Sequence, residues 1–258
     1  MMPYAVFATL AVWQRHARVW RTNFWPSVVS GILNPLFWFL SFSLGLGVVI
    51  DTMGGLPYTQ FVVPGMLANA ALFQASFETT IPAYSRFQIQ RTYAAILASP
   101  VRLSHIVAAE ILWGTAKAML SVACLYAVGF AIGGIASGTG ALLALPWVIL
   151  GSMCFASLGL AVMAHARSYE FFNYFFTFWV APSFLICGIF MDISHYPLWL
   201  QALAWCFPIT HLIDIIRPLM AGADLPLHLL ALHGTYLVVF TAVCMGLAYR
   251  RLWARLFA

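Results

Sequence analysis

Side chains that could perform chemistry are few in this chain, because charged residues make up 7% of its 258 residues. Two of them, Glu110 and Lys117, lie seven residues apart inside one long apolar segment. In a helix that rises 1.5 Å per residue, they would point to the same face, about 10 Å apart along the axis. Ionisable groups inside apolar helices normally face protein or water and are functional candidates. A structural role in helix packing or coupling and a role as ion-coupling charges both fit this pair.

A second candidate group lies near the C-terminal end of the sequence. His211 and Asp214 are three residues apart and could hydrogen-bond on one helix face, with Asp192, His195 and Arg217 nearby in sequence. The spacing matches no known metal-binding helix. Such a pair more often orients a helix than performs hydrolysis. We therefore expect no catalytic and no metal-binding residues.

The sequence lacks the P-loop that binds ATP in many transport systems. That loop needs a Gly-Lys pair followed by Ser or Thr, because the lysine reaches the terminal phosphates and the hydroxyl holds magnesium. Here the one lysine, Lys117, lies between two alanines. The chain therefore holds no ATP site of that kind, and we expect it to carry no cofactor of its own.

The elements that must position these residues are apolar helices. The composition is 63% hydrophobic, with a mean hydropathy of +0.92, far from that of soluble domains. A bilayer core of about 30 Å needs about 20 apolar residues of helix. Six runs qualify: 27–50, 59–77, 104–132, 140–164, 171–191 and 227–249. A seventh apolar stretch, 196–216, is ambiguous.

Arginine placement orients these runs, since basic residues near helix ends stay on the cytoplasmic side. Six crossings with both termini inside leave Arg217 outside and Lys117 in the membrane. The same arrangement places ten arginines in the cytoplasm: Arg15, Arg18, Arg21, Arg86, Arg91, Arg102, Arg167, Arg250, Arg251 and Arg255. A seventh crossing would break the pattern, so we interpret 196–216 as helices that dip into the outer leaflet, interrupted by Pro197 and Pro208.

Residues 1–26 are predicted to form an interfacial helix, because apolar side chains recur at helical spacing on one side and arginines crowd another. Residues 27–258 would then form a six-helix transmembrane domain. The predicted fold is an all-α integral membrane protein with six transmembrane helices, an N-terminal interfacial helix and outer re-entrant helices before the last span.

The most informative segment is 77–117, which joins the second and third predicted spans through a basic loop: FETTIPAYSRFQIQRTYAAILASPVRLSHIVAAEILWGTAK. It resembles the corresponding region of ABC-2 type transporter permeases, particularly the NodJ-like branch associated with export of lipo-oligosaccharides. Further matches are Pro64-Gly65, ARSYE at 166–170, CGIF at 187–190 and FPITHLIDIIRP at 207–218. Their joint order and spacing cover nearly the whole chain.

The resemblance implies a permease half in a bacterial inner membrane that pairs with a second copy, as a homodimer, and with two copies of a separate ATP-binding subunit that holds ATP and Mg. It implies no nucleic-acid partner. Residues 81–103 would be the coupling loop. The residues expected to couple to the ATPase are Glu78, Arg91, Thr92, Tyr93, Ile96, Leu97, Ser99 and Pro100. On physical grounds, Tyr93, Ile96 and Leu97 offer a short apolar face that could insert in a groove of the partner. An interfacial connector whose arginines only fix topology is the alternative.

Two further groups complete the expected machinery. The outer re-entrant gate would comprise Asp192, Pro208, His211, Asp214 and Arg217. The aromatic residues Phe172, Phe175, Phe176 and Trp179 could line a substrate path, although contact with lipid is the commoner role for such residues. The expected cargo is amphipathic, such as a lipo-oligosaccharide, a glycolipid or a drug.

Two other function classes remain open from the residues alone. An ion-coupled secondary transporter would use Glu110 and Lys117 as its coupling charges, although many such carriers show inverted repeats that are not evident here. An intramembrane lipid-modifying enzyme would use His211 and Asp214.

Overall fold

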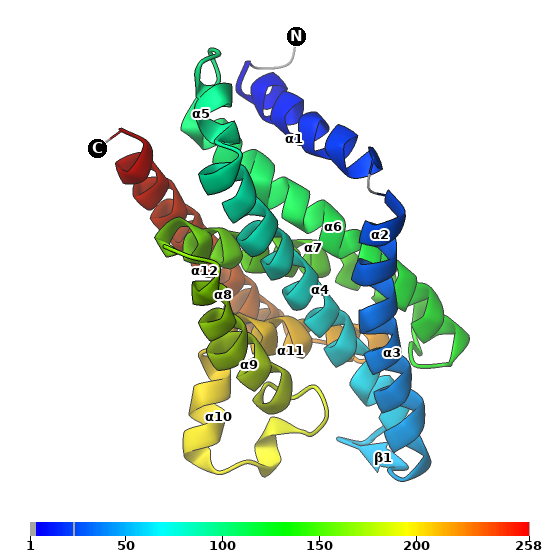
Figure 1. The fold of residues 1–258 in the computed structure, drawn as a ribbon. Helices are drawn as coiled ribbons and strands as arrows, with labels where there is room; N and C mark the ends of the chain where they lie inside the picture. Colours follow the sequence, from blue (N-terminus) through cyan, green and yellow to red (C-terminus); the bar gives the residue numbers. More distant parts are fainter. Residues whose placement is uncertain (1–3, 23, 258) are drawn as a thin grey trace.

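The computed structural model describes residues 4–22 and 24–257, and this part of the chain is almost entirely helical (Figure 1). The α-helices are α1 (Tyr4–Thr22), α2 (Phe24–Val28), α3 (Asn34–Leu40), α4 (Tyr58–Tyr84), α5 (Thr92–Leu97), α6 (Leu103–Ala131), α7 (Gly138–His165), α8 (Glu170–Phe175), α9 (Ala181–Ile186), α10 (Leu198–Trp205), α11 (Pro208–Ala221) and α12 (Leu227–Phe257). Two short strands, β1 (Thr52–Met53) and β2 (Leu56–Pro57), pair antiparallel in a hairpin.

Helices α4 and α7 form the centre of the bundle, with α6 and α11 packed on both of them and α12 on α7. Small residues allow this close approach. A Cβ atom added at Gly159 of α7 would lie 2.9 Å from the backbone oxygen of Ser76 and would collide with the Thr79 hydroxyl of α4. A Cβ at Gly114 of α6 would lie 2.6 Å from the Thr79 methyl group. Three helices therefore converge at Thr79.

Two of the segments predicted to span the membrane contain π-helical turns. Residues 24–48 run from α2 through π turns at Val29–Leu33 (η1) and Ser41–Gly45 (η2) to a 3₁₀ turn at Leu46–Val48 (η3). The segment from α8 to α9 contains a π turn at Phe176–Val180 (η5). A further π turn, Ser85–Ile89 (η4), continues directly from α4.

Three helices in the described residues, α6, α7 and α12, are long and apolar enough to cross a bilayer on their own. Helices α10 and α11 pass the same test as a pair but meet at 90°, as a broken span or a re-entrant loop would. The bend coincides with Pro208, which begins α11. Helical segments make up most of each of the six predicted spans, although residues 187–191 of the fifth are not helical. The all-α membrane class is confirmed, while the count of six and the re-entrant path remain predictions.

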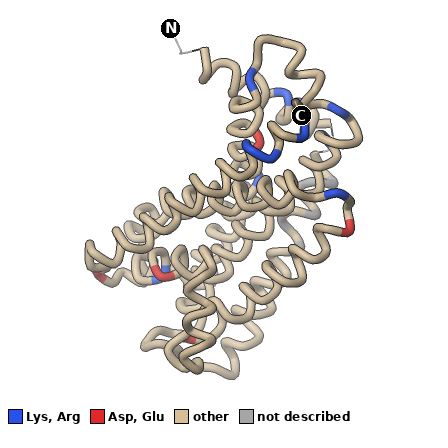
Figure 2. The backbone as a smooth tube through the Cα atoms, turned by 90° about the vertical axis from the view of Figure 1, so that its left-hand side faces the viewer, with Lys and Arg blue, Asp and Glu red and all other residues tan. Residues whose placement is uncertain are grey.

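The basic residues gather at one end of the molecule. Figure 2 shows most of the Lys and Arg positions around the end where both termini lie. Helix α1 lies across α6 at this end, beside α5 (Figure 1). We call this the arginine-rich end. The clustering matches the sequence pattern, and its cytoplasmic orientation remains a prediction.

Candidate functional site

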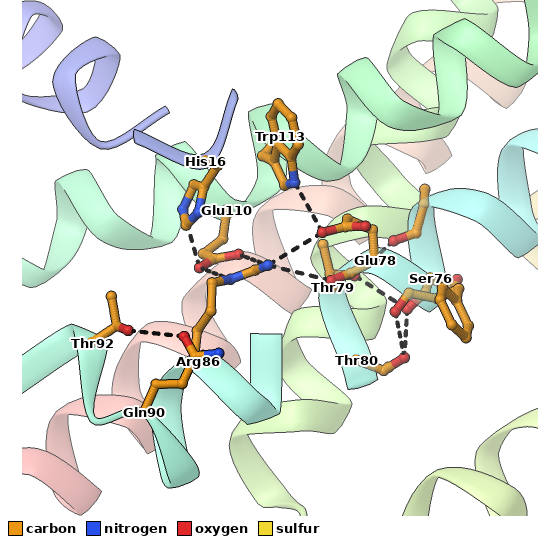
Figure 3. Close-up of polar contacts among 12 residues, drawn as sticks. His16, Ser76, Glu78, Thr79, Thr80, Arg86, Gln90, Thr92, Glu110 and Trp113 are labelled. Carbon is orange, nitrogen blue, oxygen red and sulfur yellow. Dashed lines mark hydrogen bonds and ion pairs between the residues drawn. The ribbon is translucent and has the colours of Figure 1, made fainter. Parts of the chain in front are cut away.

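A buried cluster of charges lies at the arginine-rich end, where η4, α4 and α6 meet (Figure 3). The guanidinium of Arg86 donates two hydrogen bonds to the carboxylate of Glu110, from Nε to Oε1 at 3.0 Å and from Nη2 to Oε2 at 2.6 Å. The side chain of Glu110 is 0% exposed. This bidentate geometry is the strongest form of an Arg–carboxylate pair. Arg86 therefore neutralises a carboxylate that would otherwise be buried alone.

The same guanidinium also contacts the preceding helix. Arg86 Nη1 donates to Glu78 Oε1 at 3.2 Å, and Trp113 of α6 donates to that oxygen from Nε1 at 2.9 Å. Because α4 continues to Tyr84, Glu78 lies inside the helix and is buried rather than at its end. Glu78 therefore faces the interior of the chain, and its expected role in coupling to the ATPase stays a prediction.

The N-terminal helix joins the cluster through His16. Its Nε2 lies 3.4 Å from Glu110 Oε1 (Figure 3), and the ring packs against Trp113. Burial lowers the pKa of His16 to about 4, although the Glu110 carboxylate opposes that shift. His16 is therefore neutral near pH 7, and it holds α1 on α6 by packing rather than by an ion pair.

Helix α5 is the short helix predicted to contact a partner, and Arg91 enters it in the left-handed region with φ of 49°. Tyr93 is 0% exposed and packs against the ring of Phe87, so the expectation that Tyr93 belongs to an exposed apolar face is wrong. Burial and the nearby Glu110 carboxylate raise the pKa of the Tyr93 hydroxyl well above its ordinary value. The phenol is therefore neutral and belongs to the interior beside the charge cluster.

The remaining coupling candidates divide between the two faces of α5. Thr92 is buried, with its hydroxyl 3.4 Å from the Gln90 side-chain oxygen, and Ile96 and Leu97 are half-buried against the core. The outward face instead carries small and polar residues: Arg91, Ala94, Ala95, Ala98, Ser99 and Pro100. A partner that docks here would contact small and polar side chains rather than a protruding apolar side chain.

Side chains of both terminal helices contact this loop. Tyr4 of α1 donates its hydroxyl to the carbonyl oxygen of Pro100 at 2.6 Å. Arg255 of α12 donates to the Ala166 carbonyl at 2.9 Å and to the Gln88 side chain at 3.2 Å. Its guanidinium also lies 4.7 Å from the centre of the Phe87 ring. Both terminal helices thus fix the position of the loop.

Lys117 lies about two turns beyond Glu110 on α6 and does not pair with it. Its Nζ sits 5.1 Å from the centre of the Trp20 ring. Together with Glu78 and Arg86 it lines a cavity of about 270 Å³ between α1, α4 and α6. The two intramembrane charges therefore belong to the same region but have different surroundings.

The outer candidates do not form one constellation. His211 shares a short contact with His233 (Nδ1 to Nδ1, 2.8 Å) and donates from Nε2 to the Trp205 carbonyl at 2.9 Å, so both of its ring nitrogens are occupied without Asp214. The predicted His211–Asp214 hydrogen bond is absent from the described residues. Pro208 is buried where α11 begins, and Asp214 is half-buried.

Arg217 and Asp192 form hydrogen bonds with backbone groups rather than with His211 or with each other. Arg217 donates to the carbonyl oxygens of Phe61 and Gly188, and its guanidinium lies 3.8 Å from the centre of the Phe61 ring. Asp192 accepts a hydrogen bond from the Ser194 amide at 3.0 Å. The group joins α11 to α4 and to the loop after α9, which is a positioning role.

The four aromatic candidates for the substrate path also have different surroundings. Phe172 and Phe175 are buried, and Trp179 packs against Phe207 with ring centres 4.7 Å apart. Phe176 alone of the four lines an apolar cavity of about 350 Å³ between α3, α4, η5 and α9. Trp38, Phe73 and Phe184 line the same cavity. The expected aromatic wall is therefore built from several helices rather than from one run.

In the part of the chain that the structure describes, no group of three or more His, Cys, Asp or Glu side chains could hold a metal ion. The five cysteines are free thiols.

Residues 8–221 match the family described as the ABC-2 type transporter. The chain belongs to this family. It is 35% identical over 246 residues to nodulation protein J of Rhizobium leguminosarum bv. trifolii, covering 94% of this chain and 93% of the relative. It is 32% identical over 256 residues to nodulation protein J of Sinorhizobium fredii, covering 98% and 97%. It is 24% identical over 256 residues to the inner membrane transport permease YadH of Escherichia coli, covering 97% and 98%.

These similarities make the chain the membrane subunit of an ABC exporter and a multi-pass protein of the inner membrane. Members of the family generally lack an ATPase site of their own, and membership implies a partner ATP-binding subunit. The resemblance of the 77–117 segment to ABC-2 permeases is thereby confirmed.

Two central residues of the charge cluster were not among the sequence candidates. Arg86 was counted only as a cytoplasmic charge, and His16 was not singled out. The available signal was Arg86 itself, a basic residue between two acids, Glu78 and Glu110, in segments expected to be helical. Nothing in the spacing of His16 pointed to Glu110, because the contact depends on how α1 crosses α6.

Proposed function

We propose that this chain exports an amphipathic cargo with energy from ATP hydrolysed on a separate subunit, and that α5 receives the motion of that subunit. The chain would pair with a second copy as a homodimer and with two ATP-binding subunits that hold ATP and Mg. Both termini and α5 would face the cytoplasm, as the arginine distribution predicts.

The observation that carries this proposal is the continuous contact from α5 into the transmembrane helices. Tyr93 of α5 packs on Phe87, the neighbour of Arg86, and Arg86 bridges Glu78 of α4 to Glu110 of α6. Buried ion pairs with defined geometry transmit displacement because separating them leaves an uncompensated charge. A push on α5 would therefore move the ends of α4 and α6 together.

The same geometry disfavours an ion-coupled secondary transporter. Both carboxylate oxygens of Glu110 accept hydrogen bonds from Arg86, so this group is not available to bind and release a transported ion. The lipid-modifying enzyme is also disfavoured, because the ring nitrogens of His211 contact His233 and the Trp205 carbonyl rather than an acid.

An amphipathic cargo such as a lipo-oligosaccharide, a glycolipid or a drug is supported by two observations. The apolar cavity between α3, α4, η5 and α9 has aromatic walls that suit acyl chains or the faces of sugar rings. Two of the relatives bear the name nodulation protein J. The outer group around Arg217 would then gate release.

The test uses the outward face of α5. The isolated chain should hydrolyse no ATP, and the chain co-expressed with its ATP-binding subunit should co-purify with it as an active ATPase. Replacing the exposed Ala95 by Asp should weaken this assembly without unfolding the chain, since its side chain has few neighbours. The matched control is Ala223→Asp, an exposed alanine after α11. ATP hydrolysis by the isolated chain, or equal assembly of the two variants, would contradict the proposal.

A further inference from the structure

The cavity of about 270 Å³ between α1, α4 and α6 is built differently from the apolar cavity of the bundle. We propose that it is an anion-binding pocket that takes a phosphate group, carried by a lipid headgroup or present as free phosphate. This inference goes beyond the coupling role of the charge cluster and does not depend on ATP hydrolysis.

The first observation is an unpaired ammonium group. Lys117 is 9% exposed and lines the cavity, and among the described residues it forms neither a hydrogen bond nor an ion pair. The carboxylate that shares the cavity, Glu78, already accepts hydrogen bonds from Arg86 and Trp113. A buried charge requires a partner of opposite sign, because it has lost its water. Lys117 therefore lines the cavity as a cation with no carboxylate of its own, and a ligand with anionic oxygens would compensate its charge.

The second observation is an unsatisfied donor on the opposite wall. The indole Nε1 of Trp20 is buried and has no acceptor among the described residues. Trp20 comes from α1 and Lys117 from α6, and both residues line the cavity. Buried donors are almost always paired, and a group with several acceptor oxygens would pair both of these.

The net charge of the cavity walls also favours an anion. Arg15, Arg86 and Lys117 line the cavity with Glu78 as the acid among them, and Glu110 lies behind it. His16 is neutral because burial lowers its pKa to about 4. One positive charge thus remains uncompensated, and Ser85 and Gln90 add neutral polar groups. Because α1 is expected to lie in the membrane interface, the pocket would sit close to the phosphates of lipid headgroups.

The test uses the fact that Lys117 is the one lysine in the sequence. The full chain in phosphatidylcholine nanodiscs is treated with an amine-acylating reagent, and acylation of Lys117 is followed by peptide mass mapping. Including phosphatidic acid in the nanodisc should slow this acylation about tenfold, as expected for a charged hydrogen bond. Inorganic phosphate should slow it as well if free phosphate is the ligand, and should have no effect if the headgroup is. An unchanged rate in both arms would overturn the proposal.

Matched variants separate the pocket from general attraction between charges. Arg15→Gln removes a cation from the pocket wall and should weaken the protection of Lys117, while Arg18→Gln removes an exposed cation from the same helix and should not. Equal effects of the two variants would contradict the proposal. As a second measurement, native mass spectrometry should show fewer bound phosphatidic acid molecules on Lys117→Gln than on the wild type, with recovery in Lys117→Arg. Equal lipid counts in all three would also contradict it.

Discussion

Arg86 and Glu110 are 24 residues apart in sequence and meet through two parallel hydrogen bonds, with the carboxylate fully buried. Removing one partner of such a pair costs about 3–5 kcal/mol, because it leaves the other charge without compensation. Arg86→Met should therefore lower the thermal unfolding midpoint in detergent by about 6–20 °C. Combining it with Glu110→Gln should recover much of the loss, since both charges are then gone. The control is Arg18→Gln at an exposed site. A double variant less stable than Arg86→Met alone would contradict this reading of the pair.

The docking of α1 should depend on pH through His16. The folded pKa of about 4 is below the ordinary value of 6.5, so the unfolded state takes up the proton first as the pH falls. Stability is therefore full above pH 6.5 and decreases toward pH 4. The groups that face His16 are Glu110, Arg86 and Arg15. Unfolding midpoints measured from pH 7.5 to 5 should fall less steeply in His16→Gln than in the wild type.

The matched control for that experiment is His228→Gln, an exposed histidine at the start of α12. It should keep the wild-type slope. Identical slopes for His16→Gln and the wild type would show that His16 does not carry this pH dependence.

Close packing of α4 on α7 should make Gly159 intolerant of a methyl group. In Gly159→Ala the new Cβ would lie 2.9 Å from a backbone oxygen of α4, which cannot move aside alone. We expect a loss of about 1–3 kcal/mol, as for other overpacked cores. Gly246→Ala in α12 meets open space and should be neutral or stabilising by up to about 1 kcal/mol. Thermal unfolding of both variants in the same detergent checks this, and equal midpoints would contradict it.

Arg217 should not be replaceable by lysine. Its guanidinium bridges the carbonyls of Phe61 and Gly188 and lies over the Phe61 ring, a planar forked arrangement that a single ammonium cannot reproduce. Arg217→Lys should lower stability by about 1–3 kcal/mol, whereas Arg251→Lys at an exposed position should leave it unchanged. Limited proteolysis of the loop after α9 would report the released segment. Equal cleavage rates in the two variants would argue against this role.

The helical class, the family and the special nature of the 77–117 segment could be predicted from the sequence. Long apolar runs and the positions of arginines are local signals that survive without tertiary information. The bend at Pro208 also follows from a local property, the missing backbone donor of proline.

The side-chain partners could not be predicted. Tyr93 looked like a surface anchor because its neighbours Ile96 and Leu97 share one helix face, but the loop folds that face inward onto Phe87. Helical spacing placed Glu110 and Lys117 on one face without pairing them, and it gave no sign that Arg86, on another segment, is the partner of Glu110. Such pairings depend on how helices cross, and periodicity within one helix does not contain that information.

The apolar cavity between α3, α4, η5 and α9 is bordered by segments with π-helical turns, η1 and η2 on one side and η5 on the other. A π turn holds one more residue than the α-helix around it, and each residue of an α-helix turns the chain by about 100°. If a π turn moved a few residues along its helix, the residues that it passed would rotate by about 100° around the helix axis. The two ends of the helix would stay where they are. Such a migration would turn different side chains toward the cavity without tilting or unfolding either helix.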